Sequence, residues 1–379
     1  MANHYLLTDE QLELQKLARE FAEKEIMPYA AEWDEKGEFP QEAMRKGMDV
    51  GFHLMSIPEE FGGMGLDNVT SYIIREELAK GDAGYSVSIG TNGLGMTPLL
   101  LAGNDKQKQM LADIVVPGAL TAFCLTEAQG GSDAVNSRTT AVKEGEEYVI
   151  NGTKAFITNG GVAGLYTVFA MTDKEKGARG MSAFLVEANR PGVSTGKEEN
   201  KMGIRSSNTT EVVFDNVRIP ADHLIGKEGE GFKIAMQTLD RTRPASCAGS
   251  VGIAQRAIDE CIKYSKERVV FGKPISKFQG ISFMIADMEI QTQAARQLAL
   301  YACRLLDNGI VDSVVGSAAK TFGGDNAMKV ATDAVQVLGG FGYSREYPVE
   351  KLMRDAKIYQ IFEGTNQIQR MVISGNLLK

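Results

Sequence analysis

Residues 281–306 read ISFMIADMEIQTQAARQLALYACRLL and decide the fold of the second half of the chain. Within this stretch, two series of residues recur every seven positions, the second offset from the first by four: Ile281, Met288, Ala295 and Ala302, then Ile285, Thr292, Ala299 and Leu306. Only Thr292 interrupts the apolar seam. Such a seam predicts one long helix packed against others. We therefore expect an antiparallel four-helix bundle over residues 231–379, although a seam of this length can also form an oligomer interface.

The two regions before this bundle differ from it and from each other. Residues 1–119 have helical spacing, and a capping box of Thr8 and Gln11 marks the start of the first long helix. From about residue 120 to 230, short β-rich runs alternate with turns, which is typical of a compact β-barrel or sandwich. The sequence thus predicts an α+β chain with three domains: an N-terminal helical domain (1–119), a β-barrel domain (120–230) and a C-terminal helical bundle (231–379).

The composition disfavours several classes of function. The 379 residues include 49 acidic and 41 basic side chains, and this negative excess argues against nucleic acid as the main partner. No run reaches the roughly 18 apolar residues of a membrane span, and the first residues lack the pattern of a signal peptide. Three scattered histidines and four cysteines without paired spacing predict no metal site and a reduced, cytoplasmic protein. An enzyme of this kind is expected to rely on a bound cofactor.

Five segments carry a resemblance to a known family. They are residues 123–133 (FCLTEAQGGSD), 156–161 (FITNGG), 268–272 (RVVFG), 336–342 (QVLGGFG) and 354–367 (RDAKIYQIFEGTNQ). In this order they resemble the acyl-CoA dehydrogenase family over nearly the whole chain, and the last segment is most similar to its medium- and short-chain branches. The resemblance implies FAD as cofactor, an acyl-CoA as substrate, electron-transferring flavoprotein as electron acceptor, and a homotetramer.

Several residues in these segments suit a flavin. In a strand, Phe156 and Thr158 would share one side and present an aromatic surface and a hydroxyl group to the ring. On the residues alone, a loop and a core strand explain this pattern equally well. Glycines at 339 and 340 would let backbone N–H groups approach a diphosphate, or simply end a helix. The resemblance assigns FAD contacts to Phe123, Leu125, Thr126, Gly131, Ser132, Phe156, Thr158, Arg268, Phe271, Gln336, Gly339, Gly340, Thr365 and Gln367, with Arg268 and Phe271 reaching the FAD of a neighbouring subunit.

Glu363 is the candidate catalytic base. It follows Ile358, Ile361 and Phe362, and apolar surroundings would raise the pKa of its carboxyl group. On the residues alone, a helix-capping or salt-bridged glutamate is the alternative. The resemblance implies that Glu363 removes the α-proton of the acyl group while the β-hydrogen leaves as hydride to flavin N5. In branches that carry the base elsewhere, the matching position is Thr242 here, which cannot act as a base.

The substrate is less constrained by the sequence. The resemblance places Ser132, Asp240 and Arg243 near CoA and lets the substrate pass close to Gly364, whereas solvated charges at a helix start explain Asp240 and Arg243 equally simply. Residues 85–98, expected to line the acyl pocket, contain no charged side chain, so a dicarboxylic acyl-CoA has no obvious partner there.

Gly90 and Thr91 favour a broad, short pocket in this segment. We therefore expect a butyryl-to-octanoyl substrate, and a branched or alicyclic acyl-CoA such as cyclohexanecarboxyl-CoA as the second choice. Two rival functions remain at this stage: an acyl-CoA oxidase that passes electrons directly to oxygen, and a non-catalytic scaffold that binds flavin or acyl-CoA.

Overall fold

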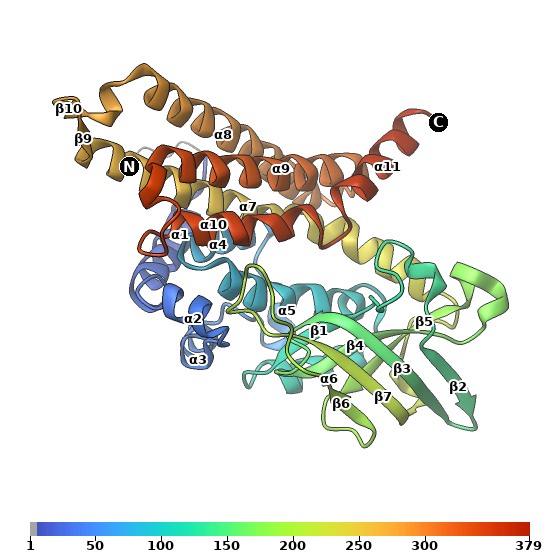
Figure 1. Cartoon of the computed structure of the whole chain (residues 1–379). Coiled ribbons are helices and arrows are strands. Elements are labelled where there is room, and N and C mark those ends of the chain that lie inside the picture. Colours follow the sequence, from blue (N-terminus) through green and yellow to red (C-terminus); the bar gives the residue numbers. More distant parts are fainter. Residues whose placement is uncertain (1–5) are drawn as a thin grey trace.

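The computed structural model describes residues 6–379, and its first group of elements is helical (Figure 1). The helices are α1 (Asp9–Phe21), α2 (Ala30–Lys36), α3 (Gln41–Asp49), α4 (Asn68–Gly81), α5 (Ala83–Ala102) and α6 (Asp105–Val115). The predicted capping box is confirmed: the Gln11 N–H donates to Thr8 Oγ1, and the Thr8 N–H donates to Gln11 Oε1. It fixes the start of α1 because it satisfies two N–H groups that the helix itself leaves unpaired.

The central group is a mixed sheet, as the β-rich runs predict. Its strands are β1 (Leu120–Cys124), β2 (Thr140–Glu144), β3 (Glu147–Thr158), β4 (Ala163–Met171), β5 (Met181–Glu187), β6 (Val193–Thr195), β7 (Thr209–Pro220) and β8 (Leu224–Ile225). Their order is β6-β7-β3-β2-β4-β5-β8, with β1 parallel to β4. The path is open, so hydrogen bonds do not close the expected barrel. The strands β6-β7-β3-β2 join the strands β4-β5-β8 through the pair Thr140–Met171, between β2 and β4.

The last group of elements is again helical. Three long helices, α7 (Gly231–Glu267), α8 (Gln279–Asp307) and α9 (Ser313–Leu338), pack on one another, while the shorter α10 (Val349–Ala356) and α11 (Asn366–Leu377) pack on α9. Between α7 and α8, the two-residue strands β9 (Val269–Val270) and β10 (Lys273–Pro274) form a hairpin that extends from the end of the helical layer (Figure 1).

The heptad seam of α8 faces its neighbours from Met288 to Ala302, and these core positions are buried. Thr292 is fully buried too, and its hydroxyl oxygen accepts a hydrogen bond of 3.2 Å from Asn326 Nδ2 on α9. Thr292, the polar residue that interrupts the apolar seam, thus makes a hydrogen bond between α8 and α9. A buried hydroxyl is tolerated when it has such a partner.

Helix α5 lies between the bundle and the sheet and joins them (Figure 1). Its Asn92 side chain donates to the His53 carbonyl and accepts from the Thr121 N–H at the start of β1. Gly95 permits the close approach, because a Cβ there would come within 2.4 Å of Thr121 Oγ1. One face of α5 can therefore line a pocket between the two domains. Within residues 6–379, no helix is both long and apolar enough to cross a membrane.

Candidate active site

The first cluster of predicted residues lies where β1 ends and β3 passes beside it. Lys154 Nζ makes a buried ion pair of 2.7 Å with Glu127 Oε1 and donates to the Leu125 carbonyl at 3.2 Å. The Ala155 N–H donates to the Thr126 carbonyl at 2.9 Å. These bonds hold the segment after Phe123 against the segment that contains Phe156. The structure therefore brings together two motifs that are separated in the sequence.

The sequence analysis did not predict that Glu127 and Lys154 hold these two segments together. Burial works against the charge on Glu127, but Lys154 and the hydrogen bonds from Lys154 and Ser137 lower the pKa of its carboxyl group far below the usual range. Burial lowers the pKa of Lys154, and its attraction to Glu127 opposes that change, so each residue favours the charged form of the other. Lys154 lies just before the FITNGG motif, and Glu127 lies inside the FCLTEAQGGSD motif. These positions next to predicted FAD contacts were the signal in the sequence that could have identified both residues.

Phe156 projects outward from a β-bulge. The pairing of β3 with β7 shifts between Lys154 and Ile157, and Phe156 has a left-handed φ of 56°. Its ring is 62% exposed and Thr158 is half-buried, whereas the residues between and before them are buried. The two side chains thus share the open side, as the strand period predicts. Gly131 and Ser132, in the adjoining loop, are exposed as well.

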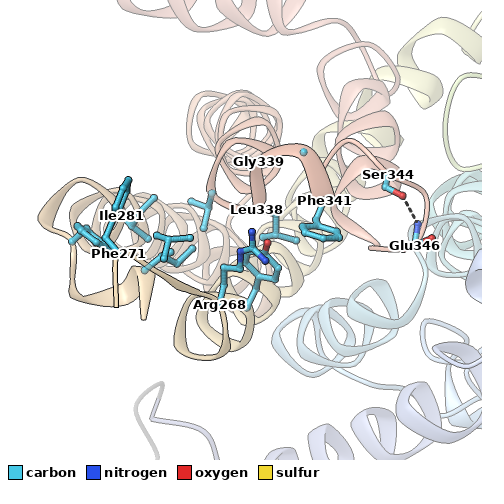
Figure 2. Close-up of a pocket in the computed structure, with 14 residues that line it drawn as sticks. Arg268, Phe271, Ile281, Leu338, Gly339, Phe341, Ser344 and Glu346 are labelled. Carbon is cyan, nitrogen blue, oxygen red and sulfur yellow. Dashed lines mark hydrogen bonds between the residues drawn. The ribbon is translucent and has the colours of Figure 1, made fainter. Parts of the chain in front are cut away.

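The second cluster lines a cavity of about 780 Å³ between the ends of α7 and α9 and the start of α8 (Figure 2). Phe271 lies toward one end of it, Phe341 toward the other, and Arg268 between them, with its guanidinium 5.4 Å from the centre of the Phe341 ring. Phe271 is 93% exposed. The cavity is therefore open and mostly apolar, and its wall carries two charged residues, Arg268 and Glu346.

Gly339 and Gly340 lie on the wall of the same cavity. Gly339 ends α9 with a φ of 61°, and its N–H donates to the carbonyl groups of Val335 and Gln336. A Cβ on either glycine would meet no atom within 4 Å, so their backbone faces open space. Gly339 thus ends the helix, and the backbone of both glycines leaves room for a ligand, while their contact with FAD stays a prediction. Gln336 is exposed on the last turn of α9 but does not line the cavity.

The two clusters of predicted FAD contacts lie far apart in the molecule. One lies by β1 and β3, and the other lies beside the β9–β10 hairpin at the opposite end (Figure 1). Thr365 lies in neither of these two clusters. It begins α11, where its hydroxyl oxygen accepts a hydrogen bond of 3.2 Å from the Ile368 N–H, and Gln367 is exposed on the first turn.

Glu363 lies in a third place, in the turn between α10 and α11. Its backbone is left-handed, with a φ of 52°, and Gly364 follows with a φ of 86°. Gln369 Nε2 donates to the carbonyls of both residues, and Lys320 Nζ donates to the Gly364 carbonyl at 2.8 Å. These bonds hold an otherwise unfavourable backbone conformation in place. Among the described residues, none accepts a hydrogen bond from the Glu363 N–H.

The charge on Glu363 is controlled by its neighbours. Burial raises the pKa of its carboxyl group, while Lys320, Arg75 and a 3.3 Å hydrogen bond from the Thr242 hydroxyl oppose that rise. Burial also lowers the pKa of Lys320 to about 8. A carboxylate with a raised pKa and partial access is suited to removing a proton near neutral pH. The helix-capping alternative does not hold, because Thr365 and not Glu363 caps α11. Within the described chain, Glu363 forms no ion pair.

Glu363 lines a small pocket of about 40 Å³. The other lining residues come from α4, α5, α7 and the segment before α11: Arg75, Ser86, Val87, Gly90, Thr91, Ala245, Ser246, Gly249, Tyr359 and Phe362. Gly90 and Thr91 are therefore where the sequence analysis expected them. Arg75 and Tyr359 were not anticipated as pocket residues; Tyr359 lies inside the motif at 354–367, whereas no motif marks Arg75.

The turn that holds Asp240 and Arg243 lies beside this pocket through Thr242. Arg243 is buried and pairs with Asp240 at 2.5 Å, while Asp240 is only half-buried. Charges solvated at a helix start do not describe Arg243, and both residues lie inside the long helix α7. Their contact with CoA stays a prediction.

Comparison with known proteins identifies the family to which the chain belongs. Three sequence models match the chain: acyl-CoA dehydrogenase N-terminal domain over residues 8–116, middle domain over 122–217 and C-terminal domain over 229–378. The chain belongs to the acyl-CoA dehydrogenase family. A probable acyl-CoA dehydrogenase, fadE25 of Mycobacterium bovis, is 47% identical over 377 residues, which cover 99% of this chain and 97% of that protein.

Two solved structures resemble this acyl-CoA dehydrogenase throughout. Butyryl-CoA dehydrogenase from Megasphaera elsdenii superposes with a TM-score of 0.96 at 45% identity, covering 98% of this chain and 99% of that one. A structure described as the electron transferring flavoprotein of Acidaminococcus fermentans gives a TM-score of 0.97 at 46% identity, with 99% of both chains covered. The homologues are oxidoreductases, so this acyl-CoA dehydrogenase is an enzyme rather than a scaffold.

Acyl-CoA dehydrogenases are FAD-dependent flavoproteins, and the residues present fit that cofactor. The exposed Phe156 ring beside Thr158 offers a surface for the flavin ring. The open backbone at Gly339 and Gly340, with Arg268 in the same cavity, suits the charged diphosphate end. These two groups lie at opposite ends of the molecule (Figure 1).

Proposed function

We propose that this enzyme oxidises a short or medium acyl-CoA to the trans-2-enoyl-CoA, with Glu363 as the base. The observation that carries the proposal is the Glu363 carboxylate at the wall of a small pocket, on a turn whose conformation Lys320 and Gln369 fix. A base held in one geometry needs no rearrangement before it meets the α-proton.

The chain supplies the groups for proton removal. The Glu363 carboxylate takes the α-proton, and its raised pKa makes the transfer from a weakly acidic carbon less unfavourable. The Glu363 N–H, which has no acceptor in the described chain, is available to polarise the thioester carbonyl as negative charge develops on the oxygen. Bound FAD supplies the two-electron acceptor for the hydride that leaves the β-carbon.

The comparisons support the finer assignments. A butyryl-CoA dehydrogenase among the structural relatives favours a short chain, and a pocket of about 40 Å³ favours a short straight chain over a cyclohexane ring. The relative described as an electron transferring flavoprotein supports such a protein as the electron acceptor. The separated FAD-binding clusters support a homotetramer in which neighbouring subunits complete each site. Four buried, free cysteines suit a reducing cytoplasm.

The experiment is anaerobic mixing of the FAD-loaded enzyme with acyl-CoA thioesters, followed through the visible flavin absorbance. The wild type is expected to bleach with butyryl- or hexanoyl-CoA. Glu363→Gln should slow bleaching by about 10²–10⁴-fold, the usual contribution of a positioned base, with FAD content and melting temperature unchanged. Glu13→Gln, at an exposed position of α1, is the matched control. Equal bleaching rates for Glu363→Gln and wild type would refute the proposal.

A further inference from the structure

Arg75 is the feature of the acyl pocket that the proposed reaction does not use. It lies on α4, and its side chain lines the pocket together with Gly90, Thr91 and Glu363. Its Nε atom is buried and has no hydrogen-bond partner. Among residues 6–379, no carboxylate lies within 4.0 Å of its guanidinium nitrogens, and that includes Glu363 of the same pocket.

Other buried cations of this enzyme are partnered. Their pairs are Lys154 with Glu127, Arg296 with Glu76, Arg243 with Asp240, and Lys351 with Asp82 and Asp355, and Lys320 is held by the Gly364 carbonyl and Asn366. A buried charge without a counter-charge is strongly unfavourable. Arg75 therefore differs from these residues because it lines a ligand pocket without an ion pair, and Glu363 of the same pocket acts on it only through longer-range attraction.

The backbone around Arg75 is shaped to admit its guanidinium. A Cβ on Gly93 would come within 2.8 Å of Arg75 Nη2, and a Cβ on Gly90 would lie 3.8 Å from its Cζ. The two glycines of α5 thus leave space that this side chain occupies. Residues 85–98 contain no charge of their own, as the sequence shows, but α4 delivers one to the same pocket.

We propose that the preferred substrate carries a carboxylate at the far end of its acyl chain, and that Arg75 pairs with it. The substrate class is the CoA monothioester of a dicarboxylic acid. This rests on the proposed function and replaces the expectation that a dicarboxylic chain has no partner here. The planar guanidinium can offer two parallel N–H donors to a carboxylate. Arg75 and Glu363 line one pocket without forming an ion pair, so in this proposal Arg75 holds the charged end of the acyl group while Glu363 acts on its reacting end.

The test compares charged and neutral thioesters of equal carbon number on the FAD-loaded enzyme. Glutaryl-CoA is paired with valeryl-CoA, and adipyl-CoA with hexanoyl-CoA, in the anaerobic bleaching assay. We expect kcat/KM to favour the better dicarboxylic thioester at least tenfold in the wild type. Arg75→Met should lower that ratio at least 100-fold, because it leaves the carboxylate buried without a partner. Arg75→Lys should keep most of the preference, and Arg179→Met, at an exposed arginine of the sheet domain, should not alter it.

Each other outcome has a defined meaning. If the wild type prefers the neutral thioesters, the carboxylate proposal is wrong while the proposed dehydrogenation stands. If no thioester bleaches the flavin, the proposed function itself fails. If Arg75→Met slows both members of a pair equally and shifts the acid limb of the pH profile, Arg75 acts through Glu363 and the proposal is overturned. If Arg75→Met loses FAD, the wild type and Arg75→Lys test the proposal instead. A kcat/KM ratio that favours the dicarboxylic thioester in both supports it, and a ratio that favours the neutral thioester in the wild type refutes it.

Discussion

The Glu363 pocket and the Arg268 cavity are built in opposite ways. The pocket measures about 40 Å³, and the chain fixes its reactive turn through Lys320 and Gln369. The cavity measures about 780 Å³ and has Phe271 standing almost entirely in solvent at its edge. The reactive turn is thus fixed by contacts within one chain. The cavity is open in this chain, which agrees with the proposal that FAD and a neighbouring subunit cover it.

The difference follows from where each site lies in the fold. The pocket forms where the middles of helices α4, α5 and α7 meet, so packing on several sides restricts each side chain. The cavity forms at the ends of α7 and α9, where a glycine C-cap and a two-stranded hairpin leave the backbone open. Substitutions in the first region should therefore alter the folded chain itself, and substitutions in the second should alter what it binds.

The largest expected effect is on the packing of the pocket. Tyr359 is 3% exposed and its ring lies 4.9 Å from that of Phe362. Tyr359→Ala should lower the free energy of unfolding by about 3–5 kcal/mol, as for other buried aromatic truncations. Urea unfolding followed by circular dichroism measures this loss. A loss below about 1 kcal/mol, the average for point substitutions, would show that the pocket is less tightly built than described.

The next effect concerns the control of the base. Lys320→Met removes a positive charge that lowers the pKa of Glu363 and a donor to the Gly364 carbonyl. The base works only when ionised, so a higher pKa shifts the acid limb of the kcat/KM profile to higher pH. The displaced turn should also lower kcat/KM by about 100-fold at neutral pH. Lys329→Met, at an exposed lysine of the same helix, is the control, and an unshifted limb would contradict this role of Lys320.

A smaller effect is expected from a substitution in the Arg268 cavity, which should alter only the affinity for FAD. Arg268→Met keeps the length of the side chain but removes its charge from the cavity wall. Loss of one charged hydrogen bond should weaken FAD binding about 10–100-fold. Titration of flavin-free protein with FAD, followed by fluorescence quenching, measures the dissociation constant. The free energy of unfolding of the flavin-free form should not change. A lower free energy of unfolding with unchanged FAD affinity would show that Arg268 stabilises the fold and does not bind FAD.

The smallest effect should come from the most exposed ring. Phe271→Ala should change the free energy of unfolding of the flavin-free monomer by no more than about 0.5 kcal/mol, because almost no apolar area of this side chain is buried within the chain. The measurement is urea unfolding at a concentration where sedimentation shows monomers. A loss like that of Tyr359→Ala would remove the distinction between the two regions.

Much of the fold could be predicted because its signals are local. The heptad seam predicts α8, and the short β-rich runs predicted between about residues 120 and 230 form the central sheet. The partner of Thr292 could not be predicted, because Asn326 reaches it from another helix. The short β1 and its parallel pairing with β4 also escaped the prediction, since a five-residue run of Leu-Thr-Ala-Phe-Cys carries little pattern.

The same distinction applies to the site. Glu363, Gly90 and Thr91 lie in segments that either match a family motif or were expected to line the pocket, and the structure brings all three to one pocket. Arg75 and Lys320 come from α4 and α9, where a charged residue in a helix normally indicates a solvent-facing side. Only tertiary packing turns these two cations inward, so their roles are not visible in the sequence.

The left-handed backbone of Glu363 has a consequence for selection. A residue held in a sparsely populated conformation costs of the order of 1–3 kcal/mol, and glycine would relieve much of that strain. Glu363→Gly should thus be nearly neutral or favourable for heat resistance while it abolishes the base. A laboratory evolution scheme that rewards thermal survival alone would erode the active centre first, so any stabilisation of this enzyme must be screened for turnover at every round.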